Sequence, residues 1–250
     1  MAVVDTVSVV VAHSERATLR VGDTFLKVDS DQSMSDREVA AMRLAPIPTP
    51  TILWRTPPVL AMAAVGGEPL GHLGAPSVAS PAAWAAAGAA ARALHEAPLP
   101  PWQGRSLIDV ASRLDAECEA LTAGGILPAE LVSGGRRMAD AALRPSQPVF
   151  MHGDFQVEHV FVDGDRVTGV IDWSEAGTGD ALFDLATLTL GHEERLADVV
   201  AGYGADVDVD VDAIRAWWAV RCLLAIRWLL ENGFDAFMPG AEVDVLKSLV

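Results

Sequence analysis

Two aspartates in the stretch from residue 149 to residue 173, VFMHGDFQVEHVFVDGDRVTGVIDW, are candidates for joint chemistry although they lie 18 positions apart. Asp154 lies in a polar loop after a short apolar segment, and Asp172 follows the apolar segment Val167–Ile171. An Asp-Gly connection joins that segment to the preceding one, Val160–Val162, which is a strong signal for a β-hairpin. Because a hairpin reverses the chain, we expect Asp172 to lie beside the loop that carries Asp154.

Two carboxylates brought together in this way repel each other, so their proximity requires a physical reason. The repulsion is relieved when a cation lies between them or when one of them is protonated. The alternative is that one aspartate caps a turn while the other is solvated, as is common for acidic residues. The residue types alone leave both interpretations open.

The residues around the two aspartates follow a known order. His152-Gly153-Asp154, a hairpin and then Ile171-Asp172-Trp173 resemble the aminoglycoside phosphotransferase family of the protein-kinase-like fold, whose pattern is H-G-D-x-x-x-x-N, a hairpin and I-D-[WF]. The continuation Gly179–Ala186, GDALFDLA, resembles the family's G-D-P-x-x-D-L-A, with Ala181 in place of proline. The linked motifs are more specific together than any one alone, and the resemblance extends from about residue 18 to about residue 186.

The resemblance implies a division of roles for phosphoryl transfer. Asp154 would orient, and in one version also deprotonate, the acceptor hydroxyl, while Asp172 would bind the Mg²⁺ that bridges the nucleotide phosphates. Such a site works mainly by positioning groups and neutralising charge. Asp180 and Asp184 are expected to be structural, holding the catalytic loop and capping the helix that begins near Ala181.

His159 departs from the family pattern, which has asparagine, the second metal ligand, at this position. Mg²⁺ prefers hard oxygen ligands, for which imidazole is a poor substitute. His159 is a candidate metal ligand, which would change the metal preference of the site. The alternatives are a contact to the metal through water and a weakened second metal site. A loop histidine that hydrogen-bonds the backbone is a further interpretation, and Gln156 or Glu158 would then supply an oxygen.

The N-terminal segments resemble the small lobe of the family and imply its nucleotide contacts. Lys27, in VGDTFLKV, matches the lysine that contacts the α- and β-phosphates, although a solvent-facing strand lysine also fits the sequence. The loop from His13 to Ala17 has no glycine and so offers no glycine-rich backbone to the phosphates, but Ser14 offers a hydroxyl. Glu38 either completes a capping box with Ser35 at a helix start or pairs with Lys27.

The predicted fold class is α+β, a protein-kinase-like fold with two lobes. A small β-rich N-lobe with one helix would span residues 1–65. A larger, mainly helical C-lobe with the catalytic loop, the metal site and the acceptor-binding helices would span residues 66–250. Gly66-Gly67-Glu68-Pro69 resembles the family's hinge, whose backbone would bind the base, so ATP and GTP are not distinguished. The proline-rich segment Pro46–Pro58 is expected to connect the N-lobe helix to a strand that begins at Val59.

Late helices line the acceptor pocket in this family, which makes four polar residues candidates for acceptor contact: Arg221, Arg227, Glu231 and Asn232. The chain has 18 Lys and Arg against 34 Asp and Glu, a formal net charge of −16. This charge argues against nucleic acid as a partner, because phosphate backbones need a basic surface. It is compatible with a cationic small-molecule acceptor, and also with an acidic protein that is simply soluble.

Further features bear on the compartment and the assembly. The two cysteines, Cys118 and Cys222, lie far apart in predicted helices, which indicates a reducing compartment without a disulfide framework or a zinc site. The N-terminal apolar run is too short to span a membrane and lacks the basic segment and cleavage site of a signal peptide. We therefore expect a cytoplasmic monomer or homodimer without a membrane partner.

These observations predict a small-molecule O-phosphotransferase. It would move the γ-phosphoryl group of ATP or GTP, with Mg²⁺, to a hydroxyl of an aminoglycoside or another cationic, antibiotic-like acceptor. The first alternative is an enzyme of the same fold with a different acceptor, such as a macrolide, a peptide antibiotic, choline or a homoserine-like metabolite, because acceptor contacts lie in variable loops. The second is a nucleotide-binding protein with little or no catalysis, which His159 favours and which the joint presence of Asp154, Asp172 and Lys27 opposes.

Overall fold

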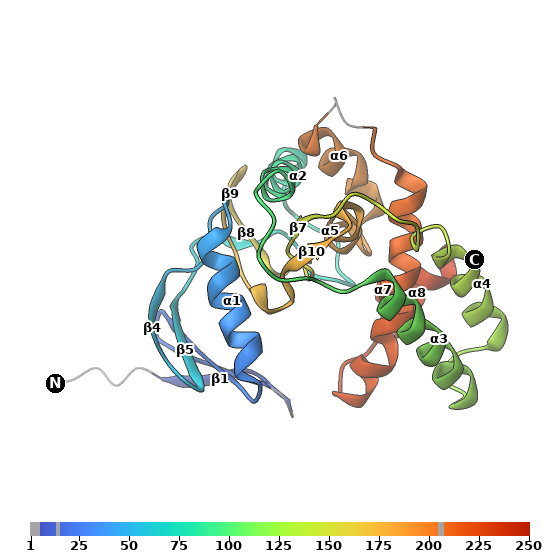
Figure 1. Cartoon of the computed structure of the whole chain (residues 1–250), viewed down its shortest axis with the longest axis horizontal. Helices are drawn as coiled ribbons and strands as arrows, with labels where there is room; N and C mark the ends of the chain where they lie inside the picture. The colour runs from blue at the N-terminus through green and yellow to red at the C-terminus, as the bar shows by residue number, and fades with distance from the viewer. Residues whose placement is uncertain (1–5, 14–15, 205–207) are drawn as a thin grey trace.

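The computed structural model describes residues 6–13, 16–204 and 208–250 and has two lobes (Figure 1). The elements of the smaller lobe are β1 (Val7–Ala12), β2 (Arg16–Val21), β3 (Thr24–Asp29), α1 (Gln32–Leu44), β4 (Ile52–Thr56) and β5 (Val59–Ala63). Its strands form an antiparallel sheet in the order β1-β2-β3-β5-β4, and α1 lies across one face, while the larger lobe is mainly helical. The predicted α+β fold with two lobes is confirmed.

Helix α1 begins earlier than predicted and has a different cap. Asp31 is the N-cap, and its carboxylate accepts a hydrogen bond from the backbone N–H of Ser33 at 2.8 Å. The predicted cap at Ser35 is wrong, since Ser35 lies inside the helix and is buried. An aspartate satisfies the free N–H groups of a helix start as well as a serine does, so the helix extends to Asp31. Glu38 is buried and accepts its hydrogen bonds from Lys27 instead of completing a capping box.

The proline-rich segment from residue 46 to residue 58 contains a strand that the sequence analysis did not predict. β4 pairs with β5, from Ile52 opposite Met62 to Thr56 opposite Val59. The prolines lie on either side of β4 and not within it. β4 is also the last strand in its sheet, where one side of the backbone needs no strand partner. The prolines therefore delimit a strand instead of excluding one.

The strands of the larger lobe form two small sheets. The first has the order β6-β8-β9, from β6 (Glu68–Pro69), β8 (Val160–Asp163) and β9 (Arg166–Val170). The second pairs β7 (Val149–Met151) with β10 (Gly177–Gly179). β8 and β9 are antiparallel and end with Asp163 opposite Arg166, which confirms the predicted Asp-Gly hairpin. β6, which belongs to the predicted hinge, pairs with β8 and so attaches the segment between the lobes to this hairpin.

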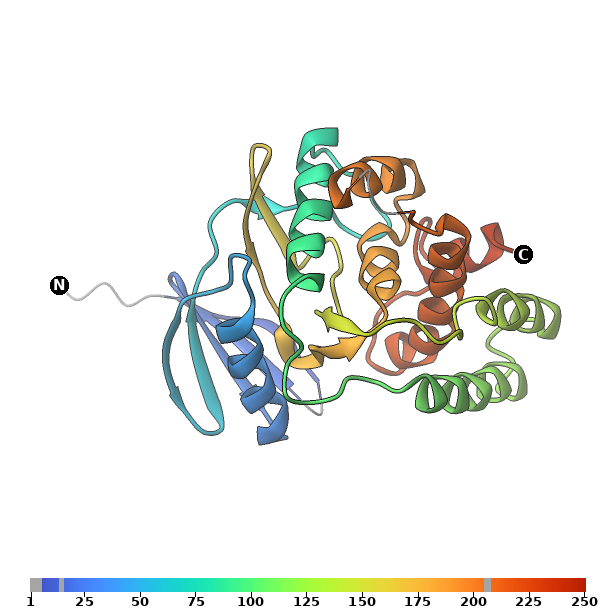
Figure 2. The ribbon, with the colours of Figure 1, turned by 45° about the horizontal axis from the view of Figure 1, so that its top comes forward.

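Helices form the rest of the larger lobe (Figure 2). They are α2 (Pro81–His95), α3 (Leu107–Ala123), α4 (Ala129–Ala139), η1 (Trp173–Glu175, 3₁₀), α5 (Ala181–Thr189), η2 (Glu193–Arg195, 3₁₀), α6 (Leu196–Tyr203), α7 (Val211–Glu231) and α8 (Glu242–Ser248). α7 packs against α3, α4, α5 and α8 and is the centre of the helical core. None of these described helices has the length and the apolar character needed to cross a membrane.

The two ends of α7 differ in burial. Its N-cap is Asp210, which accepts a hydrogen bond from the backbone N–H of Ala213 at 2.9 Å. Trp217 and Trp218 are buried, but Trp228 is 39% exposed near the C-terminal end of the helix. The core around α7 therefore covers its first half more completely than its last turns.

Helices α2 and α6 approach each other at two glycines. A Cβ atom on Gly88 of α2 would lie 2.1 Å from the backbone oxygen of Val199, and one on Gly202 of α6 would lie 1.8 Å from that of Ala85. Cβ atoms do not occur at such distances, so only glycine permits this spacing. The two helices end at His95 and Tyr203, whose side chains hydrogen-bond each other at 2.9 Å.

Replacement of Gly88 by alanine should therefore destabilise the protein. The extra methyl group forces the two helix backbones apart, and overpacking of this kind costs about 1–3 kcal/mol. For a chain of this size, each kcal/mol corresponds to a melting temperature about 2–4 °C lower. Thermal unfolding of Gly88→Ala measures the effect. Ala89→Ser, which adds one atom at the exposed neighbouring position, is the matched control, and equal melting temperatures of the two variants would contradict the close approach.

Candidate active site

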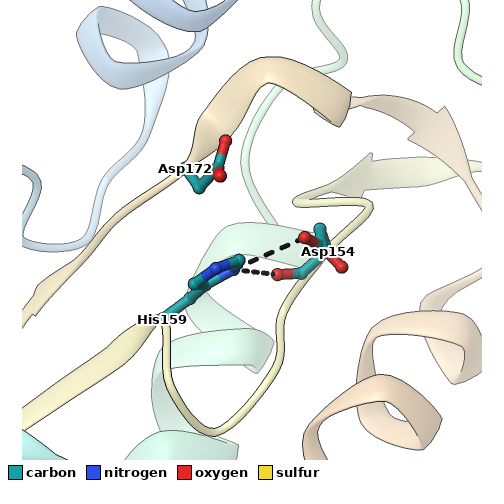
Figure 3. A group of neighbouring side chains, drawn as sticks. All are labelled: Asp154, His159 and Asp172. Atoms are coloured by element: carbon teal, nitrogen blue, oxygen red, sulfur yellow. Dashed lines mark hydrogen bonds and ion pairs between the residues drawn. The ribbon is translucent and has the colours of Figure 1, made fainter. Parts of the chain in front are cut away.

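The hairpin brings Asp154 and Asp172 together, as the sequence predicts. Each offers a carboxylate oxygen, and His159 a ring nitrogen, to a group whose atoms all lie within 4.8 Å of one another (Figure 3). His152 joins the two ends of the hairpin. Its Nδ1 accepts a hydrogen bond from the backbone N–H of Asp154 at 3.2 Å, and its Nε2–H donates to the carbonyl oxygen of Ile171 at 3.0 Å. A fully buried side chain therefore fixes the spacing between the loops of the two acids.

Asp184 of α5 holds the other side of the loop that carries Asp154. Its buried carboxylate accepts hydrogen bonds from the backbone N–H groups of His152 at 2.7 Å and Gly153 at 2.9 Å. It also lies 3.1 Å from Nε2 of His95. Gly153 has a φ of +82°, and a Cβ atom there would lie 2.4 Å from the backbone oxygen of Glu175, so this turn requires glycine.

Asp180 begins the helix that carries Asp184. It is the N-cap of α5, and its carboxylate accepts a hydrogen bond from the backbone N–H of Leu182 at 2.8 Å. Asp180 thus caps α5 while Asp184 holds the loop, which confirms the structural roles predicted for the two aspartates.

Asp154 is hydrogen-bonded by three side chains. Nη2 of Arg221, from α7, donates to its Oδ1 at 2.8 Å, and the amide of Gln156 donates to its Oδ2 at 3.2 Å. Nδ1 of His159 lies 2.9 Å from the backbone oxygen of Asp154 and 3.5 Å from Oδ2 (Figure 3). Since a carbonyl oxygen only accepts hydrogen bonds, Nδ1 of His159 carries the proton. His159 therefore makes the backbone contact that was one of the alternatives for it, and its Nε2 accepts a hydrogen bond from the amide of Gln156 at 3.3 Å.

Asp172 lies where cations from the smaller lobe meet the hairpin. It has a φ of 62°, in the left-handed region that non-glycine residues rarely adopt, and this conformation stores strain at the end of the hairpin. Its Oδ1 accepts hydrogen bonds from Nζ of Lys27 at 2.8 Å and the hydroxyl of Ser174 at 3.0 Å. Nη1 of Arg16 lies 3.1 and 3.2 Å from its two oxygens. Burial alone would raise the pKa of Asp172, but the charges of Lys27 and Arg16 hold it well below its usual range.

Lys27 and Glu38 form the pair that was one of the two alternatives for Glu38. Nζ of Lys27 lies 2.8 and 2.7 Å from the two oxygens of Glu38, and both side chains are buried. Burial alone would lower the pKa of Lys27, but the carboxylates of Asp172 and Glu38 raise it, so the ammonium stays charged. The pair joins β3 to α1 and directs the ammonium toward Asp172.

The donor atoms at this site fit a divalent cation. Asp172 and Asp154 supply hard carboxylate oxygens, which Mg²⁺ prefers, and Nε2 of His159 supplies an imidazole nitrogen. Glu158, an alternative oxygen donor, instead accepts a hydrogen bond from the backbone N–H of Leu73 at 2.7 Å. Gln156 remains beside Asp154 and His159.

The predicted site residues that remain are Ser14 and the four candidates for acceptor contact. Ser14 lies outside the described residues. Among the acceptor candidates, Arg221 contacts Asp154, whereas Arg227 pairs with Glu117 at 2.6 Å and with Glu231 at 2.8 Å. The side chain of the fourth, Asn232, hydrogen-bonds the end of α7, donating to the backbone oxygen of Trp228 at 2.8 Å.

Arg16 is the site residue that sequence reasoning missed. It is the first residue of β2, and besides Asp172 its Nε contacts Oδ1 of Asp29 at 2.6 Å. Its place at the end of a glycine-free loop was visible in the sequence, but the direction of its side chain depends on the register of β2 with β3, which sets Arg16 opposite Asp29.

A two-lobed fold with two acids at the ends of such a hairpin is the architecture of the kinase-like phosphotransferases. The chain belongs to the phosphotransferase enzyme family (APH), whose model matches residues 7–217. Viomycin phosphotransferase of Streptomyces vinaceus is 31% identical over 193 residues, which cover 66% of this chain and 62% of that protein. The chain thus matches less than two thirds of the length of this relative.

Solved structures of aminoglycoside phosphotransferases share the fold. APH(3'')-Id from Streptomyces rimosus is 25% identical with a TM-score of 0.61, covering 87% of this chain and 92% of that one. APH(2")-IIia, solved with GDP and kanamycin, is 16% identical with a TM-score of 0.73, covering 99% and 94%. The second likeness shows the fold alone.

Because His152 is buried, the free energy of unfolding of the protein should decrease as the pH falls. Burial lowers the pKa of His152, because the charged ring would lose its hydration, and a proton on Nδ1 would also face the backbone N–H of Asp154. The unfolded chain takes up a proton below about pH 6.5 while the folded state does not, so stability falls as pH drops below that value, by up to about 1.4 kcal/mol per pH unit. Urea unfolding between pH 7.5 and pH 5.5 should show a steeper decline for the wild type than for His152→Gln.

The matched control is His72→Gln, since His72 is exposed. This variant should keep the pH dependence of the wild type. Equal slopes for the wild type and His152→Gln would contradict a neutral, buried His152.

Proposed function

We propose that the chain transfers the γ-phosphoryl group of ATP or GTP to a hydroxyl of a small, cationic, antibiotic-like molecule. One observation carries the proposal: the carboxylates of Asp154 and Asp172 converge, and Asp172 is contacted by the Lys27–Glu38 pair of the other lobe. This combination provides an orienting group, a metal ligand and a phosphate-binding cation, which are the parts that phosphoryl transfer needs.

Lys27 would bind the α- and β-phosphates of the nucleotide, with Glu38 holding its ammonium in place. Asp172 would hold Mg²⁺, and His159 would join it as a ligand through Nε2. The metal, when bound, neutralises charge on the phosphate oxygens. The segment that pairs with β8 at Glu68–Pro69 would bind the base through its backbone, which leaves ATP and GTP equally acceptable.

Asp154 would orient the acceptor hydroxyl. Arg221 and Gln156 already hold its carboxylate in one position, and His159 holds its backbone oxygen, so a hydroxyl that donates to the carboxylate is fixed in direction. A loose transition state needs little removal of the hydroxyl proton before the phosphoryl group moves. The contribution of Asp154 is therefore mainly positional, which is worth a large part of the rate.

The proposed class of acceptor is supported by the similar proteins and by the net charge of the chain. The named relatives include a viomycin phosphotransferase and a structure with kanamycin bound. A formal net charge of −16 favours the approach of cationic molecules. Viomycin and aminoglycosides are therefore the first acceptors to test, followed by a macrolide and choline.

Asp154→Asn should lower the turnover number by about 100-fold or more while nucleotide affinity stays close to that of the wild type. The amide keeps the shape of the side chain but is a weaker acceptor for the hydroxyl. Phosphorylated product is measured by mass spectrometry with each acceptor and with ATP or GTP plus Mg²⁺, and nucleotide affinity by calorimetry.

Asp163→Asn, at the exposed tip of the β8–β9 hairpin, is the matched control and should turn over like the wild type. Unchanged turnover of Asp154→Asn with an acceptor that the wild type phosphorylates would refute the assigned role. Nucleotide binding without phosphorylation of any acceptor would favour the nucleotide-binding protein with little catalysis.

A further inference from the structure

We propose that Arg16 binds the terminal phosphates of the nucleotide and replaces the glycine-rich backbone that the β1–β2 connection of this chain lacks. In the structure Arg16 contacts Asp172, and on nucleotide binding its guanidinium would exchange that carboxylate for phosphate oxygens. The inference rests on the proposed function and adds a phosphate-binding residue to it.

The position of Arg16 is set by a buried ion pair. Nε of Arg16 donates to Oδ1 of Asp29 at 2.6 Å, and Asp29 lies directly opposite it in the neighbouring strand. Asp29 is 4% exposed, so this contact is shielded from water and holds one edge of the guanidinium. The other edge reaches across the lobes to both oxygens of Asp172. A planar guanidinium with several donors suits phosphate as well as carboxylate oxygens.

The charges around Asp172 favour the proposed exchange, in which phosphate oxygens replace Asp172 as the partner of Arg16. Arg16 and Lys27 share the carboxylate of Asp172. A divalent cation on Asp172 would occupy the oxygens that Arg16 now contacts and repel its guanidinium, while the phosphates bring new acceptor oxygens to the same place. The contact of Arg16 with Asp29 does not involve Asp172 and can persist through this change.

Arg16 keeps one donor group that a ligand could use. Its Nη2 has no hydrogen-bond partner among the residues that the structure describes, so a donor is left over. By contrast, Arg20 of the same strand is half-exposed and donates to its neighbour Gly22, which makes Arg20 a control for the charge of β2.

The test compares Arg16→Ala, Arg16→Lys, Arg20→Ala and the wild type in calorimetric titrations. Each protein is titrated with ATP and GTP in Mg²⁺, and with adenosine and guanosine, which have no phosphates. Arg16→Ala should bind the triphosphate about 10- to 100-fold more weakly, as expected for the loss of a charged hydrogen bond, and the nucleoside as the wild type does. Arg16→Lys should keep part of the affinity, and Arg20→Ala should keep all of it.

Each other outcome overturns the inference in a distinguishable way. Equal or tighter triphosphate binding by Arg16→Ala would mean that Arg16 only competes with the metal for Asp172. A parallel loss of nucleoside and triphosphate binding, with a lower melting temperature, would mean that Arg16 only supports the fold. Absence of nucleotide binding by the wild type would overturn the proposed function as well, whereas wild-type binding with an unaffected Arg16→Ala overturns the role of Arg16 alone.

Discussion

The ion pairs between Asp172 and the cations of the other lobe are the interaction on which the site depends. Lys27 and Arg16 reach Asp172 from neighbouring strands of the smaller lobe, and Glu38 and Asp29 hold those two cations in turn. Charged side chains are stable away from water only when each has a partner of opposite charge. Glu38 and Asp29 thus place the two cations within the smaller lobe, and Asp172 of the hairpin is contacted by both of them across the lobes. The two lobes form one site because the carboxylate of Asp172 depends on cations of the smaller lobe to stay ionised.

The backbone beneath the site depends on two further buried groups. His152 ties the loop of Asp154 to the end of β9, and Asp184 holds the backbone of that loop from α5. These hydrogen bonds act on main-chain atoms, so they fix the spacing of the two acids before any ligand arrives. Preorganisation of this kind contributes to catalysis because no rearrangement is needed when charge develops on the phosphoryl group.

Local sequence signals identified the parts of the site that lie in one continuous segment. The hairpin and the approach of Asp154 to Asp172 could be predicted because turn residues act over a few positions, and the resemblance to the family indicated the structural aspartates of α5. The partners of Lys27 could not be decided, since the Glu38 pairing depends on how α1 packs against β3. Arg16 was missed for the same reason: its contacts join positions 156 residues apart. The cap of α1 was misplaced because several aspartates and serines near the start of the helix would serve equally well.

The most direct measurement is a calorimetric titration of ATP and GTP, with and without Mg²⁺, into the wild type and Asp172→Asn. If Asp172 is the group around which metal, phosphates and cations assemble, the wild type binds a triphosphate more tightly in the presence of Mg²⁺. Asp172→Asn should then bind with an affinity that no longer depends on the metal. The same dependence on Mg²⁺ in both proteins would show that the metal is held elsewhere and would contradict the account.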